Sequence, residues 1–428
     1  MDIKEHYRLE KAKPMREKAL LVVTILFLSD GMGYVVWAGT TMSRIMNEFG
    51  LDITTVTLMM NIPLIFSVCG GLIVNKVVGL IGRKGVALLA GLGMFFCGTF
   101  PAWYGIGNSD VSVFYTFLAV RSVGGVFLGM FTPMSTSLIS DYFEGTQKRL
   151  MYGLNTTFLA LVCGVFLGLL VGYLTQFNWR YAYYIMTIYA IGCIFAGIGI
   201  PKETKEQRTF YKDTLKLLDI VRQPKRVWLY CLFMGLFMML LHMGAQTNSL
   251  IAMEKGVDNV PMTASYMLSV DTFCGAISAA TFAFYSIKLK RFTAPIVLMF
   301  MAIGFFVTAN AQGVPGLIGG YALIGVAFGG CVNSMYTNVS SNSLPGQSVA
   351  ALSLCLVFYQ TFQFLTIFAV YPVSGLLFNG AASGNLTVAG IYAVALDAVF
   401  FVLAFKRGKS SDPNHLVDLV KPAEEQRV

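Results

Sequence analysis

The chain has 428 residues, of which 56% are hydrophobic and only 12% are charged, and its net charge is +9. An ordinary soluble domain carries roughly 25% charged residues, so this composition excludes a soluble globular protein. The positive charge is expected of the loops of a membrane protein, and no nucleic-acid-binding motif accompanies it.

Twelve apolar runs follow one another along the chain, and each can cross a hydrocarbon layer of about 30 Å as a helix. They span residues 19–41, 55–78, 86–106, 112–139, 150–174, 181–200, 226–250, 262–286, 293–311, 315–339, 348–373 and 386–405. We therefore predict an all-α membrane protein of twelve transmembrane helices in two six-helix halves. The predicted halves are 19–200 and 226–405, with a linker at 201–225 and terminal segments at 1–18 and 406–428.

The distribution of basic residues predicts the orientation, because positively charged loops tend to stay in the cytoplasm. If both ends are cytoplasmic, only Arg44, Arg180 and Lys255 of the 31 Lys and Arg residues fall in outer loops, and only Arg121 falls in the interior of a span, away from its ends. We predict a multi-pass cell-membrane protein whose termini, like the linker, lie in the cytoplasm. The eight cysteines lie within predicted helices, where free cysteine packs as a small apolar residue.

An internal repeat supports two related halves. At an offset of 200 residues, the sequence from Gly125 to Gly129 is similar to that from Gly325 to Gly329. The basic turn that contains Arg83 and Lys84 after the second span has a counterpart around Lys290 after the eighth. Many secondary transporters are built from such repeats, with the solute site between them.

Several motifs together resemble the major facilitator superfamily over residues 15–407. They are the Arg-x-x-x-Gly motif of the fourth span with Asp141 after it, the glycines of the fifth span, and Asn178-Trp179-Arg180 before the sixth. The resemblance implies a twelve-helix transporter that works by alternating access. Two positions depart from the family pattern. The carboxylate usual in the loop after the second span is missing, and Leu169 stands where antiporters have Pro.

Arg121 and Asp30 are the principal site candidates. At a rise of about 1.5 Å per residue, Asp30 lies roughly 16 Å from the inner face and Arg121 roughly 14 Å from the outer face, so both reach the middle of the membrane. An isolated charge is costly there. Two roles are open: a fixed ion pair, or a solute and proton pathway in which a buried carboxylate loads and releases protons.

The other candidates are polar residues and small residues within the spans. Asp271 is a further candidate for proton coupling. The candidates for lining a solute cavity are Asn61, Arg121, His242, Gln246, Asn333, Gln360 and Gln363. For each of them, a hydrogen bond between helices is the alternative reading, and it is favoured for His242 and for Asp397. The expected gating and helix-packing residues are Arg83, Lys84, Gly125, Gly129, Pro133, Gly164, Gly168, Gly172, Gly325 and Gly329.

These features favour a proton-coupled secondary transporter of a small organic solute, with efflux by antiport slightly ahead of uptake by symport or facilitated diffusion. The residues do not distinguish protons from sodium. An enzyme is not expected, since no catalytic grouping or metal-ligand spacing is present, and a receptor is a remote alternative. No ATP-binding loop, metal or cofactor is predicted. The expected partners are the solute, the coupling ion and the lipid bilayer, and the expected functional unit is a monomer.

Overall fold

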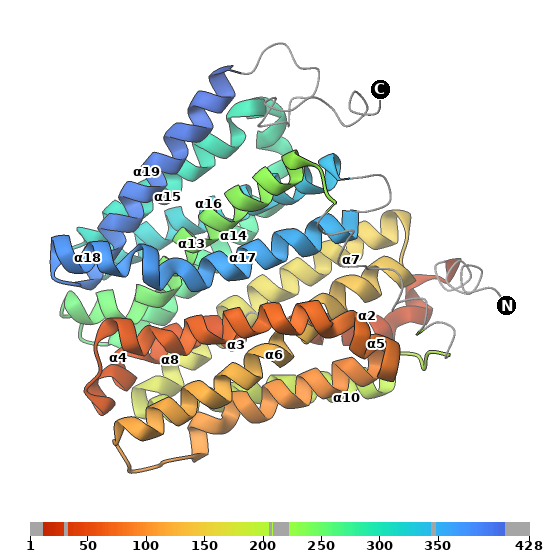
Figure 1. The fold of residues 1–428 in the computed structure, drawn as a ribbon, viewed down its shortest axis with the longest axis horizontal. Helices are drawn as coiled ribbons and strands as arrows, with labels where there is room; N and C mark the ends of the chain where they lie inside the picture. Colours follow the sequence, from red (N-terminus) through yellow and green to blue (C-terminus); the bar gives the residue numbers. More distant parts are fainter. Residues whose placement is uncertain (1–11, 30–32, 205–207, 209–221, 344–347, 407–428) are drawn as a thin grey trace. The chain divides into compact units, whose positions relative to one another are not determined.

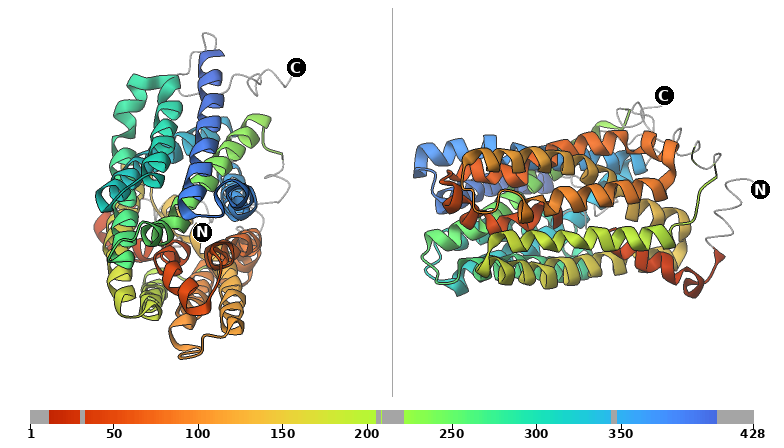
Figure 2. Two further views of the ribbon diagram at one scale, coloured as in Figure 1. Left: turned by 90° about the vertical axis from the view of Figure 1, so that its left-hand side faces the viewer. Right: turned by 90° about the horizontal axis from the view of Figure 1, so that it is seen from below.

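The computed structural model describes residues 12–29, 33–204, 208, 222–343 and 348–406. The chain forms two compact units, Met1–Leu215 and Lys216–Val428. Apart from short turns, the described residues form helices and no strands, and the long helices of each unit lie lengthwise beside one another (Figures 1 and 2). The boundary between the units falls in the predicted linker, most of which lies outside the described residues.

Unit 1 contains the elements that derive from the first six predicted spans. They are η1 (Met15–Lys18), α2 (Ala19–Phe27), α3 (Gly33–Val36), α4 (Ala38–Phe49), α5 (Ile53–Trp103), α6 (Val111–Tyr142), α7 (Gly145–Phe158), η2 (Leu159–Phe166), α8 (Leu167–Phe177), α9 (Trp179–Ala182), η3 (Tyr183–Met186) and α10 (Thr187–Gly199).

Unit 2 contains the elements of the last six predicted spans. They are α13 (Lys225–Glu254), α14 (Val260–Leu289), η4 (Lys290–Phe292), α15 (Thr293–Ala309), α16 (Val314–Asn342), α17 (Ser348–Ala369), α18 (Tyr371–Phe378) and α19 (Ala382–Lys406).

Ten stretches of the described residues are long and apolar enough to cross a membrane. The two predicted spans without such a stretch of their own are also helical. The eighth corresponds to α14, and the first is divided among α2, α3 and α4, with residues 30–32 outside the described part. The all-α prediction is confirmed, and each of the twelve predicted spans coincides with helix.

One detail of the predicted boundaries was wrong. Arg44 lies within α4, because that helix continues past the apolar run to Phe49 and ends where Gly50 adopts a left-handed φ of 62°. The second and third spans are two helices, as predicted; both are contained in α5 and meet at a sharp bend at Gly82, where φ is 76° and ψ is 166°. Glycine reaches this conformation without the steric cost that a Cβ atom would impose.

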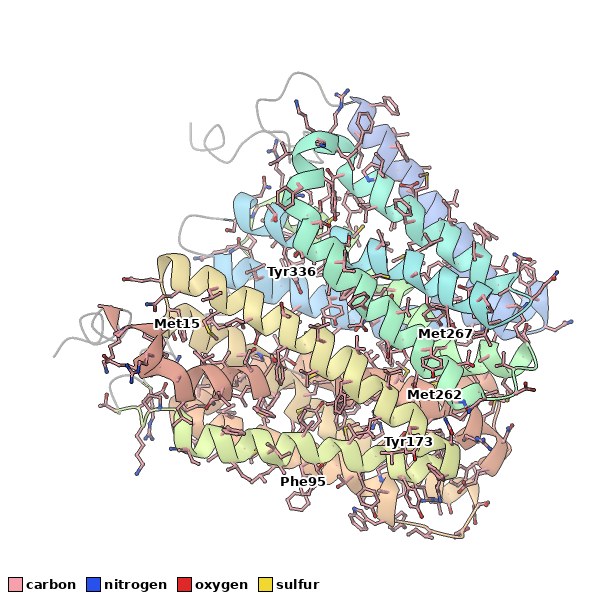
Figure 3. The ribbon with its side chains drawn as sticks, turned by 180° about the vertical axis from the view of Figure 1, so that it is seen from behind. Met15, Phe95, Tyr173, Met262, Met267 and Tyr336 are labelled. Carbon is pink, nitrogen blue, oxygen red and sulfur yellow. The ribbon has the colours of Figure 1, made fainter. Side chains whose placement is uncertain are left out.

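Large apolar side chains cover the outer surface of both units. Leu376 is 86% exposed, Phe284 is 75% exposed, and Tyr173 on α8, labelled in Figure 3, is 52% exposed. Exposed apolar surface of this extent is unfavourable in water and suits contact with lipid. The structure therefore agrees with a multi-pass membrane protein.

The same close helix contact occurs once in each unit. In unit 1, α6 crosses α5 so closely that a Cβ atom at Gly125 would overlap the backbone of Pro63, and one at Gly129 would overlap the Ser67 carbonyl oxygen. In unit 2, α16 crosses α14 in the same manner. There, a Cβ at Gly325 would overlap the Asp271 carbonyl oxygen, and one at Gly329 would overlap that of Gly275.

These contacts align the two units residue by residue. Residue n of α6 corresponds to residue n + 200 of α16, and residue n of α5 corresponds to residue n + 208 of α14. We refer to this as the repeat register. In this register Pro63 corresponds to Asp271, and Arg121 corresponds to Tyr321. The two units therefore share a backbone arrangement but differ in the polar residues at its centre.

Candidate functional site

Arg121 is fully buried inside α6 and donates hydrogen bonds to two backbone carbonyls. Its Nε donates to the carbonyl of Met59 on α5 over 3.0 Å, and its Nη2 donates to the carbonyl of Tyr34 on α3 over 2.7 Å. The third nitrogen, Nη1, has no hydrogen-bond partner among the described residues. Arg121 thus joins three helices and retains one donor that a further acceptor can use.

Pro63 explains why the Met59 carbonyl accepts from Arg121. In an α-helix the carbonyl of residue 59 would normally accept from the N–H of residue 63, but proline has no N–H. The Nε atom of Arg121 takes the place of that missing donor. Arg121 therefore stabilises the gap that Pro63 leaves in the hydrogen bonding of α5. Gly125, four residues after Arg121 on α6, packs against the same proline.

Two tyrosine rings surround the guanidinium group of Arg121. Its central carbon lies 4.6 Å from the ring centroid of Tyr34 and 5.8 Å from that of Tyr183. Aromatic faces attract cations, and this attraction is larger where water is excluded. The hydroxyl of Tyr183 lies 3.3 Å from Thr41 Oγ1, whereas the hydroxyl of Tyr34 has no partner among the described residues. Sequence reasoning missed both tyrosines, because nothing in their spacing indicates which helix faces they share.

The predicted pairing of Arg121 with Asp30 lies outside the described residues, since residues 30–32 are not among them. The described acceptor of Arg121 in that part of the chain is the carbonyl of Tyr34. The pairing stays a prediction.

Unit 2 has an uncharged counterpart of the Arg121 contact. Tyr321, which matches Arg121 in the repeat register, donates from its hydroxyl to the carbonyl of Gly244 on α13 over 2.5 Å. Asp271 occupies the place of Pro63, and its Oδ1 atom is buried without a hydrogen-bond partner among the described residues. Among the described residues, this polar centre therefore contains an acidic side chain, Asp271, in unit 2 and a basic side chain, Arg121, in unit 1.

The remaining cavity candidates are mostly buried, and several bond to neighbouring helices. Tyr371 donates to Gln246 over 3.0 Å, Asn61 donates to the Thr57 carbonyl of its own helix, and Asn333 donates to the Ala279 carbonyl over 3.4 Å. Each of four other side chains has one polar atom without a hydrogen-bond partner among the described residues. They are His242, Gln360, Gln363 and Asp397. No hydrogen bond among the described residues joins His242 to Gln360 or Gln363.

Arg83 lies at the bend of α5 and is the centre of a buried charge cluster. Its Nη1 pairs with Asp141 Oδ2 over 2.6 Å, its Nε pairs with Glu203 Oε1, and its backbone N–H donates to Glu203 Oε2 over 2.8 Å. The guanidinium also lies 5.3 Å from the ring centroid of Tyr142, whose carbonyl accepts from Lys18. The cluster joins the bend to the ends of α6 and α10.

Sequence reasoning missed Glu203, the partner that Arg83 contacts twice. Its only signal is its position two residues after Pro201, directly beyond the sixth span. The carboxylate that is missing from the loop after the second span is therefore replaced by carboxylates from two other segments, Asp141 and Glu203. Lys84 makes no ion pair within the described residues.

We expect Glu203→Gln to lower the stability of unit 1 by about 3 kcal/mol, since removing one partner of a buried ion pair leaves the other charge uncompensated. Thermal unfolding in detergent measures the loss. Glu144→Gln is the matched control, because Glu144 is exposed near the same cluster. Equal unfolding temperatures for the two variants would show that the Glu203 carboxylate contributes nothing.

Other gating and packing candidates lie in α6 and in the fifth span. Pro133 lies within α6. Gly164 lies in η2, a π-helical stretch in which Trp37 donates to the Cys163 carbonyl over 3.2 Å. Gly168 and Gly172 are buried in α8. A π-helical stretch inside a span is uncommon and often accompanies a functional position.

Arg180, predicted to lie in an outer loop, is buried in α9 and joins that helix to α4 and to the end of α5. It pairs with Glu48 over 3.1 Å and donates to the carbonyls of Pro101, Tyr104 and Gly105. Trp179 donates to the same Glu48 carboxylate over 2.5 Å. The described residues contain no cluster of side chains suited to a metal ion.

Comparison with known proteins places this geometry in a wider context. The chain matches the family model of the Major Facilitator Superfamily over residues 20–366, and no curated protein sequence matches it. The xylose transporter XylE from E. coli, in an inward-open conformation, is 15% identical with a TM-score of 0.67, covering 93% of this chain and 98% of that one. A bacterial homologue of the human lysosomal transporter Spinster is 16% identical with a TM-score of 0.67, covering 92% and 96%. A D-xylose–proton symporter is 14% identical with a TM-score of 0.63, covering 89% and 96%. At these identities the likeness concerns the fold alone.

Proposed function

Because the chain belongs to the Major Facilitator Superfamily and is a membrane transporter, we propose that it moves a small organic solute by proton-coupled secondary transport. Arg121 carries the proposal. A cation held in the middle of a membrane span, with one guanidinium nitrogen still without a partner among the described residues, is suited to bind a carboxylate or another anionic group. That anionic group belongs either to the protein or to the solute.

Proton coupling requires a carboxylate that gains and loses a proton within the span, and Asp30 is the proposed carrier. Its position in the sequence places it at the depth of Arg121. Asp271 is the second proposed carrier, because its buried Oδ1 atom lacks a hydrogen-bond partner among the described residues. One of the similar folds belongs to a proton symporter, which supports proton as the coupling ion ahead of sodium.

We expect Asp30→Asn to abolish solute accumulation driven by a pH gradient in proteoliposomes, while solute exchange without a gradient persists. The reason is that Asn keeps the size and hydrogen bonding of Asp but cannot carry a proton. Asp110→Asn, on an exposed helix cap, is the control. Normal gradient-driven accumulation in Asp30→Asn would exclude Asp30 from the coupling step.

The direction of transport is proposed as efflux by antiport, because an acidic residue in the first span that accompanies Arg121 in the fourth resembles the drug-exporter branch of the family. Uptake by symport of an organic anion is the alternative, and Leu169 in place of the antiporter proline favours it. Reversing the pH gradient across the same proteoliposomes separates them. An antiporter accumulates solute when the lumen is acidic, and a symporter does so when the outside is acidic.

We also propose that the protein resides in the cell membrane as a monomer with both termini in the cytoplasm, since almost all of its basic residues then lie on the inner side. Cysteine-accessibility labelling of residues 209–221 tests the orientation. Labelling of this segment from outside intact cells would reverse it.

A further inference from the structure

Two cysteines of unit 2 face each other across the contact between α13 and α17. Cys231 on α13 and Cys355 on α17 are both fully buried, and the thiol of Cys355 donates a hydrogen bond to the sulfur of Cys231. All eight cysteines of the chain are free thiols in the structure. A single buried cysteine packs as a small apolar residue, whereas two thiols in direct contact can also be joined covalently.

The backbones of α13 and α17 approach each other closely one turn beyond this pair. A Cβ atom at Gly235 would lie 2.7 Å from the ring of Phe362 and 3.3 Å from the carbonyl oxygen of Phe358. Further along the same two helices, Thr366 donates to the carbonyl of Met239 over 3.2 Å. A disulfide needs Cα atoms about 4.4–6.8 Å apart, and helices reach that separation only where they pack as tightly as this.

A tyrosine from a third helix contributes to the surroundings of the pair. Tyr336 on α16, labelled in Figure 3, interacts electrostatically with both cysteines and with Tyr359 on α17. A structural metal site usually needs about four ligands, and no group of three or more suitable side chains occurs within the described residues. A disulfide is uncharged and needs no hydrogen-bond partner, so it suits a buried position between helices better than a metal ion does.

The pair lies at a similar depth in both helices. Cys231 is six residues after Lys225, where α13 begins, and Cys355 is seven residues after Ser348, where α17 begins. Each cysteine is therefore about 10 Å along its helix. In the orientation proposed above, these helix ends face the cytoplasm, which keeps thiols reduced, and the disulfides that do form there are mostly transient and respond to oxidants.

We propose that Cys231 and Cys355 form a reversible disulfide when hydrogen peroxide reaches them. The sulfur of one thiol attacks a peroxide oxygen, the O–O bond breaks, and the departing hydroxide takes the thiol proton and leaves as water. The second sulfur then attacks the resulting sulfenic acid, whose S–O bond breaks, and a second water leaves with the second thiol proton. Two thiols and one peroxide thus give one disulfide and two waters, and a thiol reductant reverses the reaction.

The disulfide would fasten α13 to α17 and close a long loop, because α14, α15 and α16 lie between the two cysteines in the sequence. A cross-link that closes a long loop restricts the unfolded chain, so oxidation should stabilise unit 2. The bond would also protect both sulfurs from irreversible oxidation to sulfinic and sulfonic acids. None of these effects depends on the proposed transport function.

Mass spectrometry of the purified full-length protein tests the proposal directly. The protein in detergent is exposed to increasing hydrogen peroxide, unfolded in the presence of an alkylating agent, and digested. We expect a disulfide-linked pair of peptides that contain Cys231 and Cys355, the loss of two of the eight free thiols, and their recovery with dithiothreitol. The unfolding temperature should rise by several degrees on oxidation and return to its starting value on reduction.

Three variants establish whether the rise comes from this pair. Cys231→Ala and Cys355→Ala each remove one sulfur and keep a small apolar side chain, so both should fold and lose the rise. Cys193→Ala removes a buried cysteine of α10 in unit 1 and should keep it. The proposal is overturned if no linked peptide pair forms in wild type at any peroxide concentration that leaves the protein folded. It is also overturned if Cys193→Ala loses the rise as fully as Cys231→Ala.

Discussion

Gly129→Ala is expected to abolish folding of unit 1, or to lower its unfolding temperature drastically, although it adds a single methyl group. The new Cβ atom would overlap the Ser67 carbonyl oxygen and approach the Gly71 amide nitrogen, both of which are backbone atoms of α5. Overpacking a core typically costs about 1–3 kcal/mol when side chains can shift, and here the obstruction is backbone. Gly329→Ala should have the same effect in unit 2, because its Cβ would overlap the Gly275 carbonyl.

Gly319→Ala is the matched control. Gly319 lies in α16, ten residues before Gly329, and a Cβ atom there would have no neighbour within 4 Å. Alanine should therefore be neutral, or stabilising by up to about 1 kcal/mol through its higher helix propensity. Size-exclusion profiles in detergent and thermal unfolding compare the three variants. A monodisperse Gly129→Ala protein with the unfolding temperature of wild type would show that α5 and α6 do not pack as described.

A double-mutant cycle on Arg121 and Pro63 is the second prediction with a large expected effect. Arg121→Met should destabilise unit 1 by about 3 kcal/mol or more, because it leaves the Met59 and Tyr34 carbonyls buried without a donor. In a Pro63→Ala background, the new amide of residue 63 can donate to the Met59 carbonyl within α5. The loss caused by Arg121→Met should then be smaller by about 1 kcal/mol, the net contribution of one hydrogen bond.

Unfolding free energies of the four proteins give the coupling between the two sites directly. Arg121→Lys provides the control for charge, since lysine keeps the cation but loses the planar set of donors that reaches two carbonyls at once. It should fold better than Arg121→Met and still transport poorly. Strictly additive effects of Arg121→Met and Pro63→Ala would mean that Arg121 does not substitute for the missing N–H of Pro63.

The family and the helical membrane fold were both predictable from the sequence, for a physical reason. A span of about twenty apolar residues has one low-energy solution in hydrocarbon, a helix that satisfies its own backbone hydrogen bonds. Each predicted span therefore coincides with a helix, and the match to the Major Facilitator Superfamily confirms the resemblance. The repeat of Gly125 and Gly129 at Gly325 and Gly329 was likewise visible, and the structure adds which backbone atoms these glycines face.

The partners of the charged residues were decided only by the tertiary structure. The sequence singled out Arg121 because a cation in hydrocarbon is costly, but its Met59 and Tyr34 acceptors are backbone carbonyls, which carry no signature in the sequence. Glu203 lies 120 residues from Arg83 and joins it only because the end of α10 comes to the bend of α5. Apolar periodicity determines that a helix forms and where it ends, whereas the contacts of a buried polar group depend on how the helices pack, and many packings are compatible with one apolar pattern.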